Sequence, residues 1–171
     1  MKTLSTKKLI LSALFMALTI VSTMFIRVPL LLGYVNLGDA FVFLSAFILG
    51  PILGVVIAGV GSAVADLFGY ISYAPGTLII KTAMALVACL LYKLLIKSTK
   101  KKLLAEIVAG VVGTLIMAVG YFIYETLFFS TAIIALMNLP WNLLQGAIGI
   151  IVSVIIMRIL SSANILEKLQ D

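Results

Sequence analysis

The sequence predicts an all-α, polytopic membrane protein: a bundle of six transmembrane helices with both termini in the cytoplasm. Hydrophobic residues make up 64% of the 171-residue chain and charged residues only 11%. A water-soluble protein of this size could not bury so large an apolar fraction in its core. The apolar runs reach the length of about 20 residues that crosses a bilayer. Lysines gather beside these runs, at Lys2, Lys7 and Lys8 and again over 97–102, as is typical of cytoplasmic loops.

The first span is expected over Leu9–Ile26, and it ends at Arg27-Val-Pro29 because proline lacks a backbone donor and disfavours helix before it. A loop then leads to Asp39. No polar stretch is long enough for a soluble domain, so we interpret residues 1–171 as one membrane domain.

The apolar run from Ala40 to Phe68 would form a helix about 43 Å long, which exceeds one untilted crossing. Gly50-Pro51 offers a break, and two short spans, Ala40–Leu49 and Ile52–Leu67, keep the lysine clusters on one side of the membrane. After the turn-rich loop Gly69–Gly76, three more spans are expected: Thr77–Leu95, Ala105–Phe128 and Leu139–Leu160.

Polar side chains are few, and the six-span arrangement places most of them in the outer half of the bundle. Tyr121, Tyr124 and Glu125 have the spacing that puts them on one helix face. Asn138, Trp141, Asn142 and Gln145 form a similar stripe on the last span. Two such stripes facing one another are suited to a small, flat, polar ligand from outside.

These residues predict a site between the fourth, fifth and sixth spans, covered by the loop Arg27–Asp39. Trp141, Tyr121 or Tyr124 would stack on a planar ring, while carboxylate and amide groups would orient it by hydrogen bonds. The candidate substrate-binding residues are Asn36, Asp39, Lys81, Tyr121, Tyr124, Glu125, Trp141, Asn142 and Gln145.

Two other interpretations of the same residues stay open. The amides of Asn142 and Gln145 are also suited to hydrogen bonding between helices, and Trp141 and the tyrosines to anchoring at the membrane interface. Asp66 and Lys81 are either ligand contacts or a structural pair with one another.

Several function classes are excluded by what the chain lacks. It contains no histidine, no P-loop motif and no nucleophile elbow or zinc motif, so we expect neither an enzyme nor a metal or cofactor site. The single Cys89 lies in an apolar run and cannot form an intrachain disulfide. The basic residues flank apolar runs, which indicates a lipid bilayer and no nucleic acid as the partner.

Three stretches resemble the substrate-binding S components of energy-coupling factor (ECF) vitamin transporters. They are Ala13-x-x-x-Ala17 in the basic-flanked first helix, Asn36-Leu-Gly-Asp39 running into Val42–Gly54, and Gly61–Asp66 followed by Tyr73-Ala-Pro-Gly-Thr-Leu-Ile-Ile-Lys81. The resemblance implies a six-helix bundle in the prokaryotic cell membrane that captures one vitamin or precursor from outside.

The resemblance also implies docking through Ala13 and Ala17 onto a transmembrane coupling subunit that carries two ATPase subunits. The last two stretches look closest to importers of hydroxymethylpyrimidine, pyridoxine or similar heterocycles, with hydroxymethylpyrimidine the best match. A stand-alone secondary transporter with Glu125 or Asp66 as proton carrier, and a membrane scaffold without a substrate, are the alternatives.

Overall fold

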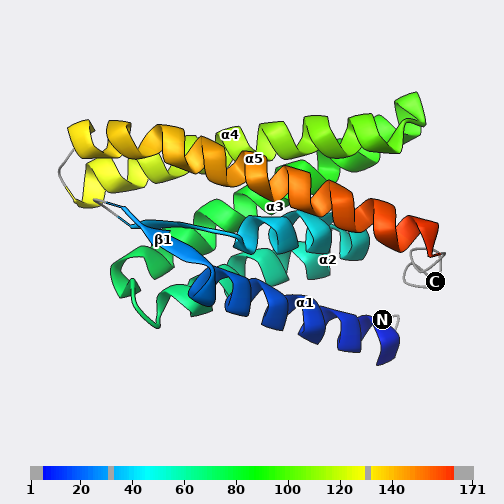
Figure 1. The fold of residues 1–171 in the computed structure, drawn as a ribbon, viewed down its shortest axis with the longest axis horizontal. Coiled ribbons are helices and arrows are strands. Elements are labelled where there is room, and N and C mark those ends of the chain that lie inside the picture. The colour runs from blue at the N-terminus through cyan, green and yellow to red at the C-terminus, as the bar shows by residue number, and fades with distance from the viewer. Residues whose placement is uncertain (1–5, 31–32, 130–131, 164–171) are drawn as a thin grey trace.

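The computed structural model describes residues 6–30, 33–129 and 132–163, in which five long helices run along a common axis (Figure 1). All five are long and apolar enough to cross a membrane. A short antiparallel hairpin and one 3-10 turn are the other elements of this described part. The elements are α1 (Thr6–Phe25), β1 (Arg27–Pro29), β2 (Tyr34–Asn36), α2 (Gly38–Asp66), η1 (Ile71–Tyr73), α3 (Ala74–Thr99), α4 (Lys102–Phe128) and α5 (Ala132–Ser162).

The two predicted spans Ala40–Leu49 and Ile52–Leu67 both lie in α2, so the described residues hold five helices where six were expected. The reason is that only Gly50 leaves the helical conformation, with φ 83°, and no loop separates the two arms of α2. The arms nevertheless fold back on one another. Ser45 Oγ donates to the Gly54 carbonyl at 3.1 Å, although residues nine apart along a straight helix are about 13 Å apart.

Gly54 permits this reversal. A Cβ there would lie 2.2 Å from the carbonyl oxygen of Ser45, so no side chain fits between the arms. As a result both ends of α2 lie at the same end of the bundle. The first arm is the centre of the core, where Val42, Phe43 and Leu44 are fully buried. The helix packs against α1, α3 and α5.

The last helix differs from its predicted bounds. It begins at Ala132, before the expected start at Leu139, and continues through Pro140. Long membrane helices tolerate a proline when neighbouring groups compensate the lost backbone hydrogen bond. The consequence is that Asn138 lies inside the helix, on the same face as Asn142 and Gln145.

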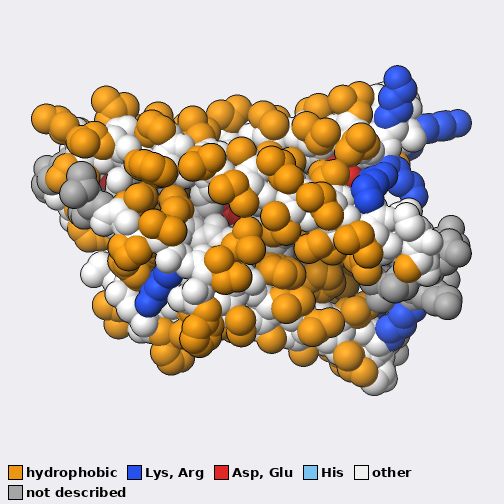
Figure 2. Space-filling view, in the orientation of Figure 1, with side chains coloured by type: hydrophobic (Ala, Val, Ile, Leu, Met, Phe, Trp, Pro, Cys, Tyr) orange, Lys and Arg blue, Asp and Glu red, His pale blue; other side chains and the backbone are white. Residues whose placement is uncertain are grey.

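The surface has an apolar body and a basic end, as expected for a membrane protein. Side chains such as Ile79, Leu115 and Ile151 are exposed along the body of the bundle, where they would face lipid. Figure 2 shows Lys and Arg side chains gathered at the end of the molecule where Figure 1 places the N and C labels. The end of α3 and the start of α4, with Lys97 and the lysines at 100–102, lie at this basic end (Figure 1); Lys2 and Lys168 are outside the described residues.

Candidate functional site

The hairpin β1–β2 covers the end of the bundle opposite the termini (Figure 1). Its register pairs Arg27 with Asn36 and Pro29 with Tyr34. Tyr34 and Asn36 are two residues apart on one strand and therefore share a face. That face is turned to the helices: the Tyr34 hydroxyl donates to Asp66, and the Asn36 amide N–H donates to Gln145 Oε1 at 2.8 Å.

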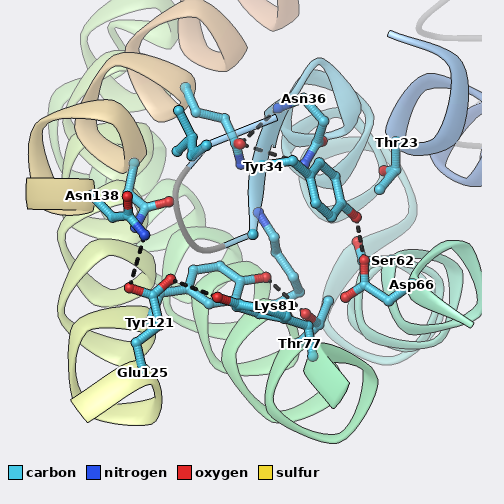
Figure 3. A pocket seen from close by; sticks show the side chains of 15 residues that line it. Thr23, Tyr34, Asn36, Ser62, Asp66, Thr77, Lys81, Tyr121, Glu125 and Asn138 are labelled. Carbon is cyan, nitrogen blue, oxygen red and sulfur yellow. Dashed lines mark hydrogen bonds between the residues drawn. The ribbon is translucent and has the colours of Figure 1, made fainter. Parts of the chain in front are cut away.

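A cavity lies beneath the hairpin, and all five helices contribute to it (Figure 3). Its volume is about 20 Å³, room for roughly one water molecule, because the surrounding side chains fill most of the space. The lining residues are Thr23, Leu30, Gly33, Tyr34, Asn36, Ser62, Asp66, Tyr73, Thr77, Lys81, Tyr121, Glu125, Asn138, Asn142 and Gln145.

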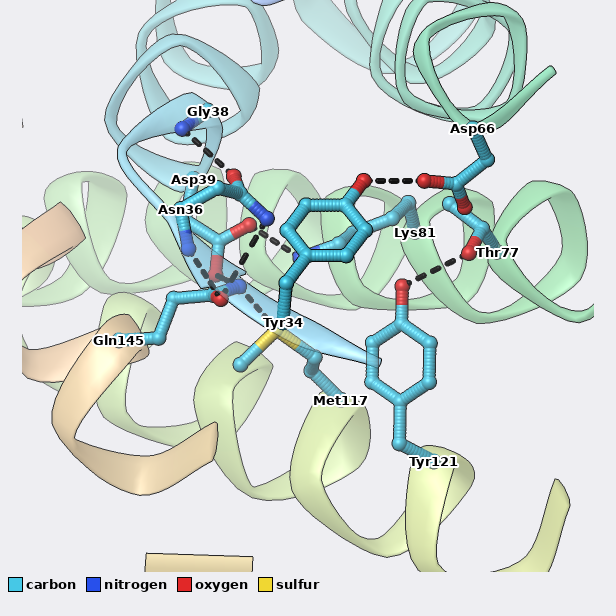
Figure 4. Close-up of polar contacts among 10 residues, drawn as sticks. All are labelled: Tyr34, Asn36, Gly38, Asp39, Asp66, Thr77, Lys81, Met117, Tyr121 and Gln145. Atoms are coloured by element: carbon cyan, nitrogen blue, oxygen red, sulfur yellow. Dashed lines mark hydrogen bonds and ion pairs between the residues drawn. The ribbon is translucent and has the colours of Figure 1, made fainter. Parts of the chain in front are cut away.

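A buried ion pair joins Lys81 of α3 to Asp39 in the first turn of α2 (Figure 4). Both side chains are at most 3% exposed. Gln145 Nε2 donates to the second Asp39 oxygen at 2.7 Å, and Met117 Sδ lies 2.9 Å from Lys81 Nζ. The absence of a side chain at Gly149 lets α2 come this close to α5, since a Cβ there would lie 2.8 Å from Asp39 Cβ.

Of the two interpretations of Asp66 and Lys81, the one that makes them a structural pair with one another is wrong. The reversal of α2 brings Asp39 to the Lys81 ammonium, whereas Asp66 accepts the hydrogen bond from Tyr34. Burial raises the pKa of the Tyr34 phenol, and the neighbouring Asp66 carboxylate raises it further. Tyr34 therefore remains a protonated donor to Asp66 at neutral pH.

Glu125 lies at another side of the cavity and is 2% exposed. It accepts hydrogen bonds from the Tyr73 hydroxyl at 3.3 Å and from Asn138 Nδ2 at 3.2 Å, both neutral donors. Thr77 Oγ1 and the Tyr121 hydroxyl lie 3.0 Å apart. The rings of Tyr73 and Tyr121, 6.4 Å apart, give this side an aromatic surface beside the carboxylate.

Six of the predicted substrate-binding residues line the cavity, and a seventh, Asp39, lies directly behind Lys81 and Gln145. Two others do not line it. Tyr124 is turned toward η1, where its hydroxyl donates to the Ser72 carbonyl at 2.5 Å. The six are Asn36, Lys81, Tyr121, Glu125, Asn142 and Gln145.

Trp141 is the second predicted residue outside the cavity. It is 49% exposed and lines a separate, open groove of about 380 Å³ together with Pro29, Leu30, Met137 and Asn138. Trp141 directly precedes Asn142, so it is rotated about 100° around the helix from that inward-facing amide.

The cavity also contains residues that the sequence prediction did not select. Ser62, Thr23 and Thr77 are hydroxyl side chains within apolar runs, and such residues commonly bond to their own helix backbone. The one sequence pattern that could have pointed to them is the spacing of Ser62 and Asp66, which lie one helical turn apart and so share a helix face. The other lining residues outside the predicted set are Leu30, Gly33, Tyr34, Asp66, Tyr73 and Asn138.

Comparison with known proteins agrees with this fold. Residues 3–162 match the family described as the ECF-type riboflavin transporter, S component. The chain belongs to this family. It is thus a membrane-embedded, substrate-binding transport subunit, and its family works with an ECF module of a coupling subunit and ATPases.

A solved structure titled "Structure and mechanism of the S component of a bacterial ECF transporter" has the same fold as this S component. The TM-score is 0.69 at 23% identity, over 93% of this chain and 98% of that one. An uncharacterized protein of Pyrococcus woesei, encoded in the gap 3′ region, is 48% identical over 63 residues. That match spans 36% of this chain and 43% of the relative's length.

Removing one partner of the Lys81–Asp39 pair is expected to destabilise the protein. Lys81→Met leaves the Asp39 carboxylate buried without a cation and should lower the free energy of unfolding by about 3–5 kcal/mol. Thermal unfolding in detergent measures the loss. The double variant Asp39→Asn/Lys81→Met should lose much less than the two single changes added together.

Lys97→Met is the control, because Lys97 is exposed on the same helix, and it should change stability by less than about 0.5 kcal/mol. A Lys81→Met protein that unfolds like the wild type would show that the pair does not stabilise the bundle.

Proposed function

We propose that this S component is a single membrane domain in the prokaryotic cell membrane that captures a planar vitamin from outside. It delivers the vitamin inward when docked on a coupling subunit and two ATPases. The observation that carries the proposal is the buried polar cavity beneath the hairpin, in a chain of the ECF S component family. Riboflavin is the first candidate, because the matched family is described by that substrate.

The chemistry of the cavity supports a flat heterocycle with hydrogen-bonding edges. Tyr73 and Tyr121 offer ring surfaces, and Glu125 offers a carboxylate acceptor beside them. Asn142 and Gln145 add amides that both donate and accept. Hydroxymethylpyrimidine and pyridoxine, which the Gly38-Asp39 loop and the 74–81 stretch suggest by resemblance, satisfy part of the same set and are the competing candidates.

Entry of any vitamin requires the hairpin to move, because the cavity of about 20 Å³ is far smaller than such a ligand. The hairpin is held by the Tyr34–Asp66 and Asn36–Gln145 hydrogen bonds. We propose that these bonds open and that ligand groups replace them. The exchange of one hydrogen bond for another keeps the energetic cost of opening small.

Docking on the coupling subunit is proposed to use the outer face of α1. Ala13 and Ala17 are exposed there, one turn apart, while Phe15 and Thr19 face the bundle. Small side chains let a partner helix approach closely, which favours helix association in lipid.

For the topology we propose that the basic end is cytoplasmic and that the two arms of α2 count as separate membrane segments, six in total. Lys97 in the last turn of α3 and the lysines at 100–102 lie at the end of the bundle where α1 begins and α5 ends (Figure 1). Cytoplasmic ends carry the excess of lysine and arginine.

Purified wild-type protein is expected to bind riboflavin more tightly than hydroxymethylpyrimidine or pyridoxine in calorimetric titrations. Glu125→Gln and Asn142→Ala each remove one ligand partner from a site closed to water. Each should weaken riboflavin binding by about 5- to 150-fold. Glu106→Gln is the matched control, since Glu106 is also fully buried on α4 but pairs with Arg158.

If Glu125→Gln and Asn142→Ala both bind riboflavin within twofold of the folded wild type, these polar residues only hold helices together. Tighter binding of one of the smaller heterocycles would replace riboflavin as the substrate. Uptake into liposomes driven by a proton gradient without ATPases would favour the secondary transporter.

Ala17→Trp is expected to abolish ATP-driven uptake by the assembled complex while riboflavin affinity stays within twofold. The bulky ring blocks the close approach of a partner helix. Ile123→Trp, at an exposed position of α4, controls for added bulk at the lipid surface and should transport normally. Normal uptake by Ala17→Trp would move the docking face elsewhere.

A membrane-impermeant thiol reagent tests the orientation in intact cells, after Cys89→Ala removes the native thiol. Ser72→Cys, at the hairpin end, should be labelled from outside. Ser98→Cys, at the basic end, should be labelled only after permeabilisation; both serines are exposed, so accessibility is matched. The reverse pattern would invert the orientation.

A further inference from the structure

The hydroxyl of Thr23, in the last turns of α1, is buried without a hydrogen-bond partner among the described residues. The side chain is 2% exposed. Buried hydroxyls nearly always have a partner, so an orphaned one calls for a physical explanation. Thr23 also lines the cavity beneath the hairpin.

Three other helical threonines, Thr19, Thr82 and Thr126, make a backbone hydrogen bond that Thr23 lacks; Thr114 on α4 lacks a partner as well. Thr19, one turn earlier on α1, donates to the Phe15 carbonyl at 2.8 Å. Thr82 and Thr126 likewise each donate to the carbonyl four residues earlier in their own helix, at 2.6 and 2.7 Å. Thr23 makes no such bond, and its hydroxyl is available to a group outside its own helix.

The position of the Thr23 hydroxyl depends on Gly38, the first residue of α2. A Cβ at Gly38 would lie 2.0 Å from Thr23 Oγ1. The backbone of α2 therefore leaves room for this oxygen where any other residue would collide with it.

Thr23 lies beside Ser62 and Asp66 on one side of the cavity, while Glu125 and Asn138 lie on the other (Figure 3). The cavity thus has two polar walls. One is built by α1 and α2 and carries hydroxyls and a carboxylate. The other is built by α4 and α5 next to the tyrosine rings.

We propose that Thr23, Ser62 and Asp66 form a subsite for a hydroxylated side chain of the ligand. The proposal rests on the proposed function and adds where the non-aromatic part of the ligand binds. An alcohol both donates and accepts, so it satisfies a carboxylate and a hydroxyl together. The Tyr34 hydroxyl now fills the donor place on Asp66, and a ligand hydroxyl takes that place when the hairpin opens.

Riboflavin and lumiflavin separate this wall from the ring site, because lumiflavin has the same ring with a methyl group in place of the polyhydroxylated chain. Affinities are measured by quenching of flavin fluorescence with purified protein in detergent. Thr23→Val keeps the side-chain shape and removes the hydroxyl. It should weaken riboflavin binding by about 5- to 150-fold and leave lumiflavin within twofold.

Two variants serve as controls. Thr23→Ser keeps the hydroxyl and should bind riboflavin within about threefold of the wild type. Thr19→Val removes a buried hydroxyl from the same helix that is bonded to its own backbone, so it should leave both flavin affinities unchanged. Ser62→Ala should show the same selective loss of riboflavin as Thr23→Val.

Unchanged riboflavin affinity in folded Thr23→Val and Ser62→Ala would overturn the subsite and leave the proposed function intact. Equal weakening of both flavins would also overturn it, because the effect would then be on the ring site or the fold. If the wild type binds neither flavin, riboflavin as the proposed substrate fails, and this subsite fails with it.

Discussion

The bundle depends on one buried charge pair, Lys81 with Asp39. Burying an unpaired ammonium or carboxylate inside an apolar bundle costs free energy, and each charge of the pair lowers the cost of burying the other. Gln145 accepts the Asn36 amide and donates to Asp39, which extends the pair from α2 and α3 to α5 and the hairpin. A single polar network therefore sets how these helices sit relative to one another and where the hairpin rests.

The reversal of α2 at Gly50 makes this network possible. If α2 were straight, Asp39 and Asp66 would lie about 40 Å apart at opposite ends of the helix. The fold-back brings both carboxylates to the hairpin end, where Asp39 neutralises Lys81 and Asp66 holds Tyr34. Two glycines carry the change: Gly50 supplies the left-handed backbone and Gly54 the room for the arms to touch.

The same network couples the cavity to its cover. Tyr34 and Asn36 fasten the hairpin through groups that also line the cavity, namely Asp66 and Gln145. In the proposed mechanism, a ligand that competes for these groups loosens the hairpin as it binds. The hydrogen bonds that hold the hairpin therefore end on the same side chains that the cavity offers to a ligand.

The sequence by itself determined the membrane class, the break at Gly50-Pro51 and the inward face of Asn142 and Gln145. These follow from hydropathy, backbone chemistry and helical periodicity, all of which are local. Only the tertiary structure decided that Lys81 pairs with Asp39, that Trp141 lies outside the cavity and that Thr23 lies on its wall. Those outcomes depend on how helices distant in sequence rotate and pack against one another. In an apolar sequence with few charges, the local pattern of residues does not specify that packing.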